Sequence, residues 1–474
     1  MRTAAVFLAA LLSFAAPAAQ RDAATVTFLH FNDVYEITPV EAGKTGGLAR
    51  LATFRDGLKA QHPELVTTLG GDFLSPSALS TARVNGEPLY GRQMVAVLNA
   101  LGLDWATFGN HEFDLPEAIF RARLAESTFR FVSSNVTDKE GAPFPGTVPY
   151  AIVPVKIGGR TIRIGLLGLT IDSNRQPWVR YAPPLESARA AVAHLRGQCD
   201  LVVALTHVTL DTDIQLAEQV ADIELILGGH EHENWVIQRG PYFTPIVKAD
   251  ANVRTAAVVT VRFPATGGRP EATARIQRID DRIKDEPRVA REVARWIDLG
   301  FAGFRKEGFE PTEIVKVVDR PMRGTEAEVR SGSTQLTELI ADAMRHEAGT
   351  GISVFNAGSI RIDDVLIPGP ITQYDVIRVL PYGGKVLRAT LTGDLLSRVL
   401  EIGRGNKGTG GFLQTAGIPE TIDPSARYTV AIASFLLTGN ERNLAFLTRQ
   451  NPEVSDITEL RDVRLAVIDE LRKR

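Results

Sequence analysis

Residues 223–232 read IELILGGHEH: a short apolar run, then two glycines, then two histidines around a glutamate. The apolar run is typical of a buried strand, and glycine allows the backbone to turn tightly directly after it. Four earlier apolar runs are also followed at once by titratable or amide side chains. These junctions read NDVY at 32–35, GGD at 70–72, GNHEFD at 109–114 and TH at 206–207.

Helical patterns lie between the predicted strands. Apolar residues recur at helical spacing in 47–59, 91–101 and 185–196. Strands that alternate with helices predict a layered α/β fold. In such folds the ligand site lies beyond the carboxyl ends of the strands. We therefore expect the five junctions to converge at one edge, although they are far apart in the sequence.

The junction side chains offer carboxylate, amide and imidazole donors together. This mixture suits a borderline divalent metal such as Zn, Mn, Fe or Co. Two ions about 3.5–4 Å apart require a bridging ligand, and a carboxylate can bridge with its two oxygens. A single Asp after a strand is usually a turn or cap residue. It is the recurrence of the pattern that predicts a metal centre.

Composition and charge exclude several classes of protein. The 474 residues include 53 Lys and Arg against 56 Asp and Glu, and 44% are hydrophobic. This is an ordinary globular composition, and the absence of a basic excess argues against a nucleic-acid polymer as partner. Cys199 is the only cysteine. It follows that the chain has neither an intramolecular disulfide nor a thiolate zinc cluster.

Residues 1–19 have the pattern of a signal peptide. Arg2 gives a positive start, an apolar run follows, and APA at 16–18 fits a small-residue cleavage site. No later apolar stretch is long enough to span a membrane. We expect a soluble, periplasmic or secreted protein, and a monomer.

The sequence pattern changes after residue 284, where charged and apolar residues recur at helical spacing. We predict a catalytic domain over 24–284, which holds all five junctions, and a helical linker over 285–312 that lets the next domain swing. Residues 313–474 have strands and helices of their own and predict a second domain.

The five junctions resemble the motifs of the calcineurin-like metallophosphoesterases, and in particular those of the 5′-nucleotidase family. The second domain carries further family motifs in the same order: NAGSIR at 356–361, LPYGG at 380–384, GFLQ at 411–414 and FLLTGNE at 435–441. The resemblance covers nearly all of the mature chain. It implies an α/β (α+β) fold, with a layered β-sandwich flanked by helices followed by a smaller mixed α/β nucleotide-specificity domain.

The resemblance also implies a centre of two divalent ions (Zn, Mn, Co, Fe or Mg). Its ligands would be Asp33, Asp72 and His232 for one ion, and Asp72, Asn110, His207 and His230 for the other, with Asp72 bridging. His111 would be the catalytic imidazole and Asp114 its orienting partner. These two are three residues apart, so one helical turn could bring them together. A carboxylate there fixes the tautomer of the imidazole and stabilises its charged form.

By the same resemblance, the second domain holds the nucleotide. The implied contact residues are Asn356, Gly358, Arg361, Tyr382, Phe435 and Glu441, with Arg330 in a neighbouring segment. Tyr382 and Phe435 would stack on the two faces of the base, which contributes about 1–3 kcal/mol per base. Two alternatives stay open: Phe435 as core packing and Arg361 as part of a structural salt bridge.

Three positions depart from the family pattern. Tyr35 stands where the family has histidine, Tyr382 where phenylalanine is frequent, and Asn440-Glu441 where Gly-Asp is usual. A neutral tyrosine is a poor ligand. Tyr35 therefore binds a metal weakly, binds it as phenolate, or gives way to water.

The sequence predicts metal-dependent hydrolysis of nucleotide phosphate esters, with hydroxide attack on nucleoside 5′-monophosphates. Other enzyme activities that fit are 2′,3′-cyclic phosphodiesterase with 3′-nucleotidase, UDP-sugar hydrolase and sulfur-ester hydrolase. A different class is a nucleotide-binding protein with an impaired metal site.

Overall fold

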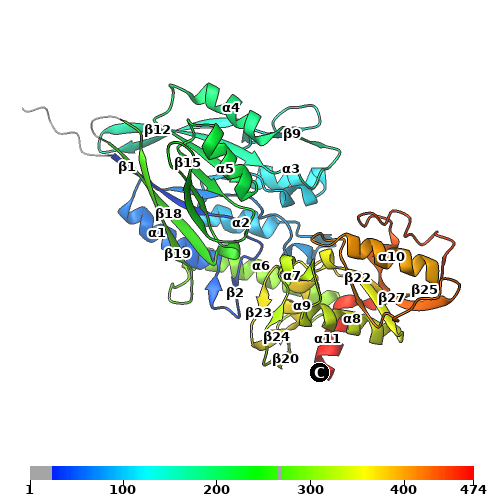
Figure 1. The fold of residues 1–474 in the computed structure, drawn as a ribbon. Helices are drawn as coiled ribbons and strands as arrows, with labels where there is room; N and C mark the ends of the chain where they lie inside the picture. The colour runs from blue at the N-terminus through cyan, green and yellow to red at the C-terminus, as the bar shows by residue number, and fades with distance from the viewer. Residues whose placement is uncertain (1–23, 265–267) are drawn as a thin grey trace, which may run out of the picture.

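Two lobes are visible in the computed structural model of the chain, which describes residues 24–264 and 268–474 (Figure 1). The predicted signal peptide at 1–19 lies outside the described residues. None of the helices within the described ranges has the length and apolar character that a membrane crossing requires. The larger lobe is built from the first part of the chain, and the smaller lobe carries the C-terminus.

The larger lobe contains two stacked sheets. The first has the order β10 (Thr147–Val148), β8 (Arg130–Val132), β7 (Trp105–Ala106), β4 (Val66–Leu69), β1 (Ala24–Phe31), β18 (Thr255–Phe263) and β19 (Glu271–Arg278). The second has the order β11 (Tyr150–Ile157), β12 (Arg160–Thr170), β14 (Leu201–His207), β15 (Leu225–Gly228), β17 (Thr244–Lys248) and β16 (Trp235–Arg239).

Each of the five strands that end in a predicted junction runs parallel to a neighbouring strand. β1, β4 and β7 run parallel in the first sheet, and β14 and β15 do so in the second. Apolar side chains from both sheets, including Phe28 and Leu166, fill the space between them. Because parallel strands finish at the same edge, all five junctions reach one end of the sandwich.

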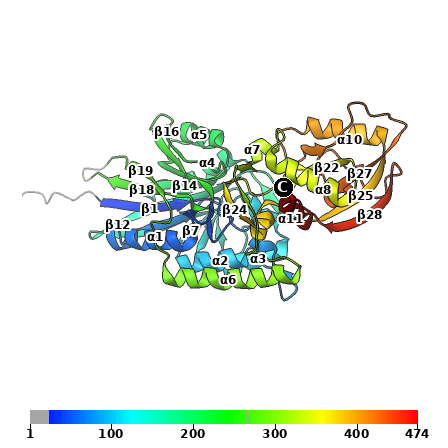
Figure 2. The same ribbon diagram turned by 90° about the horizontal axis from the view of Figure 1, so that it is seen from below.

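Helices cover the outer faces of both sheets. Against the first sheet lie α1 (Leu48–Gln61), α2 (Arg92–Leu101) and α6 (Pro287–Lys306), which run together along one side of the lobe (Figure 2). Against the second sheet lie α4 (Pro184–Leu195) and α5 (Leu210–Gln219). The layered sandwich flanked by helices is thus confirmed, and α1, α2 and α4 lie within two residues of the bounds predicted for them.

The segment 285–312, predicted as a linker, forms α6, and this helix packs closely on the larger lobe. The helix contacts α1 and α2, and its Trp296 side chain is buried. At Gly300 the helix approaches so closely that an added Cβ would overlap the Leu79 side chain. The helix therefore belongs to the helical layer of the larger lobe, and the chain crosses to the smaller lobe only after it.

The smaller lobe is a mixed α/β unit, as predicted. Its sheet has the order β26 (Leu413–Ala416), β22 (Ile352–Asn356), β27 (Arg427–Ala433), β25 (Lys385–Thr392) and β28 (Val454–Asp462). Alternate residues of β22 face opposite sides: Phe355 packs with α8 (Gln335–Ala348), and Val354 packs with α10 (Gly393–Gly405). This period of two is that of a strand covered on both faces.

Candidate active site

The five strand ends converge as the sequence predicts. Asp33, Asp72 and His207 are buried, and each presents a ligand atom within 4.8 Å of those of the other two. His207 Nε2 lies 3.1 Å from Asp72 Oδ2 and 4.0 Å from Asp33 Oδ1. His232 Nε2 lies 3.2 Å from Asp33 Oδ1. The backbone N–H of His230 donates to Asp33 Oδ2. The ring centroids of His230 and His207 are 5.3 Å apart.

Two buried polar atoms at this centre lack a hydrogen-bond partner among the described residues. They are His207 Nε2 and Asn110 Oδ1. The His207 ring hydrogen-bonds the Gly70 carbonyl through Nδ1 at 2.7 Å, so the neutral form of the ring presents an Nε2 lone pair to Asp72 and Asp33. This lone pair and the amide oxygen of Asn110, beside two buried carboxylates, are groups that a bound cation would satisfy together. The donor set therefore fits a divalent metal centre.

The electrostatics of the centre agree with this fit. Burial opposes the charged form of His207, yet Asp72 and Asp33 together raise the pKa of its ring to about 9. The two carboxylates therefore attract cationic charge strongly enough to overcome desolvation of the ring.

Backbone strain is concentrated at the same residues. Residues other than glycine rarely adopt positive φ, and clusters of such residues mark functional sites. Four of the predicted ligands do so: Asp33 (φ 53), Asp72 (φ 54), His230 (φ 93) and His232 (φ 57). Close packing adds to the constraint, because a Cβ added at Gly109 would overlap the Asp72 carboxylate.

His111 and Asp114 form the predicted dyad. Both lie on the short helix η2 (His111–Asp114), where His111 Nδ1 and Asp114 Oδ2 are 2.7 Å apart. Asp114 also accepts hydrogen bonds from Ser75 Oγ at 3.0 Å and Asn174 Nδ2 at 2.8 Å. The backbone N–H of His111 donates to Asp72 Oδ1 at 2.8 Å. The dyad is therefore fixed next to the predicted bridging carboxylate.

The Tyr35 hydroxyl reaches into the centre. It lies 2.9 Å from His232 Nε2, 3.2 Å from Asp33 Oδ1 and 3.4 Å from Asp72 Oδ2. Burial and the adjacent Asp72 and Asp33 carboxylates hold the pKa of this phenol well above its usual value of about 10. The side chain is thus a neutral phenol placed among the predicted ligands.

Glu112 is a residue that our reading of the sequence missed. Its buried carboxylate accepts backbone N–H bonds from the strand-end loops: Asp72 (2.9 Å), Phe73 (2.8 Å), Leu74 (3.1 Å) and Gly109 (2.5 Å). Burial, together with the charge of Asp72, raises its pKa to about 7, while these donors favour the charged form. Glu112 ties the loop that carries Asp72 to the loop that carries Asn110.

Replacing Glu112 by alanine should destabilise the protein without removing a predicted ligand. The change leaves four buried N–H groups without their acceptor, so we expect the free energy of unfolding to fall by about 2–3 kcal/mol. Urea denaturation followed by circular dichroism measures this. Glu218→Ala, on the exposed face of α5, is the control and should change the value by less than about 0.5 kcal/mol. Equal effects of the two changes would contradict the role given to Glu112.

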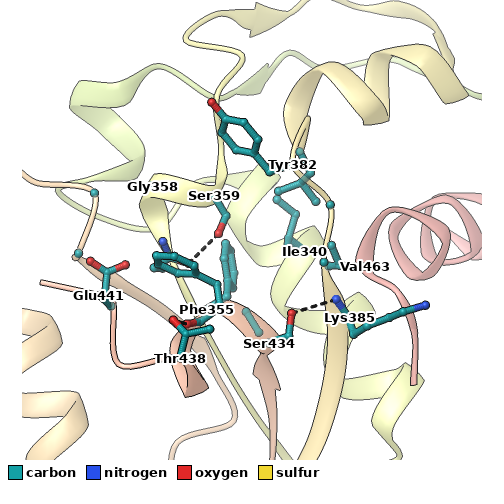
Figure 3. Close-up of a pocket in the computed structure, with 18 of the residues that line it drawn as sticks. Ile340, Phe355, Gly358, Ser359, Tyr382, Lys385, Ser434, Thr438, Glu441 and Val463 are labelled. Carbon is teal, nitrogen blue, oxygen red and sulfur yellow. Dashed lines mark hydrogen bonds between the residues drawn. The ribbon is translucent and has the colours of Figure 1, made fainter. Parts of the chain in front are cut away.

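Two cavities meet near these residues. The smaller, of about 430 Å³, is lined by residues of the larger lobe such as Tyr35, Asn110 and His111, and by Arg361 and Asp363 of the smaller lobe. The larger, of about 780 Å³, lies in the smaller lobe (Figure 3). Its lining includes all six predicted nucleotide contacts: Asn356, Gly358, Arg361, Tyr382, Phe435 and Glu441.

The aromatic residues of the larger cavity present their rings to solvent. Tyr382 is 55% exposed and Phe435 is 43% exposed, which is unusual for large apolar side chains and does not fit a core role for Phe435. The Arg361 guanidinium lies 5.9 Å from the Tyr382 ring centroid and 3.7 Å from Glu326 Oε1. Arg361 lines both cavities. Arg330 pairs with the same Glu326 carboxylate, so this carboxylate lies between Arg330 and Arg361, although the side chain of Arg330 does not line the larger cavity.

Comparisons with known proteins find one family match in each lobe. Residues 26–234 match the family model for calcineurin-like phosphoesterase, and residues 314–427 match that for the 5′-nucleotidase C-terminal domain. A snake venom 5′-nucleotidase from Naja atra is 26% identical over 453 residues, which cover 85% of this chain and 82% of that protein.

Two solved structures share the fold across almost the whole chain. A 5′-nucleotidase precursor from Thermus thermophilus superposes with a TM-score of 0.73 at 23% identity, covering 95% of this chain and 96% of that one. The sulfate thiohydrolase SoxB from the same organism has a TM-score of 0.68 at 17% identity, covering 94% of each.

Proposed function

The chain belongs to the 5′-nucleotidase family of calcineurin-like metallophosphoesterases, and from that premise we propose that it hydrolyses nucleoside monophosphates at the 5′-phosphate. The observation that carries this proposal is the pair of adjoining cavities that share Arg361. One cavity has metal-ligand and imidazole chemistry, and the other has exposed aromatic rings. A nucleotide has the same two halves, a phosphate and a flat base.

The family's two divalent ions would be held by Asp33, Asp72 and His232, and by Asp72, Asn110, His207 and His230. When bound, they supply an acidified water as nucleophile and neutralise charge on the phosphoryl oxygens.

The residues of the chain position the substrate and move protons. Asp114 holds Nδ1 of His111, so the opposite edge of the ring is available to hydrogen-bond a phosphoryl oxygen or protonate the leaving alkoxide. Arg361, at the junction of the cavities, pairs with the phosphate or contacts the ribose. Tyr382 and Phe435 stack on the base, while Asn356 and Glu441 accept or donate hydrogen bonds at the base and ribose. The formed dyad supports hydrolysis over simple binding, because a binding protein has no need of it.

We also propose that the protein is periplasmic or secreted and acts as a monomer. The signal-peptide pattern of residues 1–19 supports export.

The proposal is tested by chromatography of the products, together with phosphate release, from a substrate panel in the presence of Mn²⁺, Zn²⁺, Co²⁺ or Mg²⁺. The panel contains the four common nucleoside 5′-monophosphates, a 2′,3′-cyclic nucleotide, a UDP-sugar and p-nitrophenyl phosphate. The wild type should act most efficiently on a 5′-monophosphate, and chelation should abolish this activity. Preference for the cyclic ester or for the UDP-sugar would replace the proposal by that activity.

In the same panel, Phe435→Ala separates base recognition from chemistry. Loss of a stacking face costs about 1–3 kcal/mol, so KM for the preferred monophosphate should rise about 5- to 150-fold. Hydrolysis of p-nitrophenyl phosphate, which needs only the smaller cavity, should stay near the wild-type rate.

The matched control is Phe243→Ala, which removes a phenylalanine that is 70% exposed on the turn between β16 and β17. It should leave both substrates unaffected. Equal damage to both substrates from Phe435→Ala would show that Phe435 supports the fold of the lobe instead of the base.

A further inference from the structure

A carboxylate of the smaller lobe, Asp363, contacts a predicted metal ligand of the larger lobe, His232. Asp363 lies between η4 (Ala357–Ser359) and β23 (Val365–Leu366), and its Oδ2 accepts a hydrogen bond from His232 Nδ1. Its other oxygen accepts the backbone N–H of Glu326 at 2.7 Å. The side chains of Asp363 and His232 are 21% and 23% exposed, so the contact between them is mostly shielded from water. Asp363 has φ 37, a left-handed conformation that non-glycine residues rarely adopt.

This contact determines which atom of His232 faces the centre. A ring that donates through Nδ1 to a carboxylate presents its Nε2 lone pair, and that Nε2 lies 3.2 Å from Asp33 Oδ1. His207 is oriented differently, because its Nδ1 bonds the Gly70 carbonyl within its own lobe. One predicted histidine ligand is therefore oriented from inside the larger lobe, and another from across the lobe boundary.

Neighbouring contacts fix the Asp363 segment on the larger lobe. The adjacent Asp364 pairs with Arg254 at 2.6 Å. On α9 (Gln373–Val379), Tyr374 and Arg378 reach the buried carboxylate of Glu36 at 3.1 and 3.4 Å. Glu36 directly follows Tyr35 in the chain. The smaller lobe is thus pinned beside the loop that carries the predicted metal ligands.

From these contacts we propose that Asp363 is a positioning residue for His232, and that retention of the ion on His232 therefore depends on the smaller lobe. The proposal rests on the two-metal assignment of the proposed function. Two of the three residues assigned to this ion are carboxylates, and Tyr35 replaces a second imidazole with a neutral phenol. His232 is left as the one imidazole assigned to that ion, so its orientation carries more weight than it would in a site with two.

The test measures metal binding directly, apart from catalysis. The full-length mature chain, stripped with a chelator, is titrated with Co²⁺ by calorimetry and by visible absorption of the bound ion. The wild type should bind two ions. Asp363→Ala should weaken one of them about 10- to 100-fold and leave the other unchanged, the usual range for loss of a residue that orients a metal-bound histidine.

Asp364→Ala is the matched control. It removes a carboxylate from the same loop and breaks an inter-lobe ion pair, but it does not contact His232. It should bind both ions with nearly wild-type affinity. Asp363→Asn tests the chemistry more finely: the amide oxygen can still accept from Nδ1, so the loss of affinity should be smaller than for alanine. Circular dichroism verifies that each variant is folded.

Unchanged binding of both ions by Asp363→Ala would overturn the proposal. Equal weakening in Asp363→Ala and Asp364→Ala would also overturn it, because the effect would then come from the lobe boundary and not from His232. These outcomes are distinct from failure of the proposed function: a wild type that binds two ions but prefers another ester refutes only the substrate assignment. A wild type that binds no ion refutes the metal assignment, and this proposal with it.

Discussion

Asp72→Ala is expected to abolish hydrolysis and to remove metal from both positions of the centre. Asp72 Oδ2 lies beside His207 Nε2, and its Oδ1 accepts the backbone N–H of His111. The same carboxylate approaches the Tyr35 hydroxyl, so it lies between the two predicted ligand sets. Loss of one charge-stabilising donor alone can slow an enzyme about 10²–10³-fold. Loss of both ions should exceed that, leaving only background rates.

The measurement combines elemental analysis of the purified variant with phosphate release. Asp33→Ala is the comparison, because Asp33 is assigned to one ion only and should leave the other bound. An Asp72→Ala protein that still held two ions would show that the bridge is formed by another residue.

His111→Ala should reduce kcat about 10²–10⁴-fold while both ions remain bound. The imidazole is assigned to proton transfer and charge stabilisation, so its loss acts on the transition state and spares the metal ligands. Steady-state kinetics together with metal analysis separate these two effects.

Asp114→Asn tests the same dyad with a smaller chemical change. The amide oxygen can still accept from Nδ1 at the 2.7 Å position, but it lacks the charge that stabilises the imidazolium. A smaller loss than in His111→Ala is therefore expected. Loss of metal from His111→Ala would reassign that histidine as a ligand.

The convergence of the strand-end junctions could be predicted from the sequence because it depends on topology. Parallel strands bring their carboxyl ends together whatever their separation along the chain. The dyad was likewise predictable, since its two members are three residues apart and interact locally. The predicted nucleotide contacts came from the resemblance, and six of them line the larger cavity. Arg330 does not line it, but it shares the Glu326 carboxylate with Arg361.

Other parts of the site depend on contacts that periodicity does not encode. Glu112 is inside a recognised motif, but its bonds go to backbone groups as far as 40 residues away. Asp363 meets His232 across 131 positions and a lobe boundary. Asp72 follows two glycines, and this indicates a tight turn in the sequence. The sequence does not show that Asp72 itself adopts a positive φ. The packing of α6 on the larger lobe depends on the close approach of Gly300 to the Leu79 side chain, and a helical pattern alone does not reveal this contact.

Arg361 belongs to the walls of both cavities, and this has a consequence for inhibitor chemistry. An aryl fragment suits the exposed rings of Tyr382 and Phe435, and a phosphonate suits the smaller cavity. If a linker that passes Arg361 joins the two fragments, binding of one raises the effective concentration of the other. Two weak fragments then yield one tight ligand. An aryl compound that fills only the larger cavity would compete with nucleotides while p-nitrophenyl phosphate is still hydrolysed, giving substrate-selective inhibition of a single enzyme.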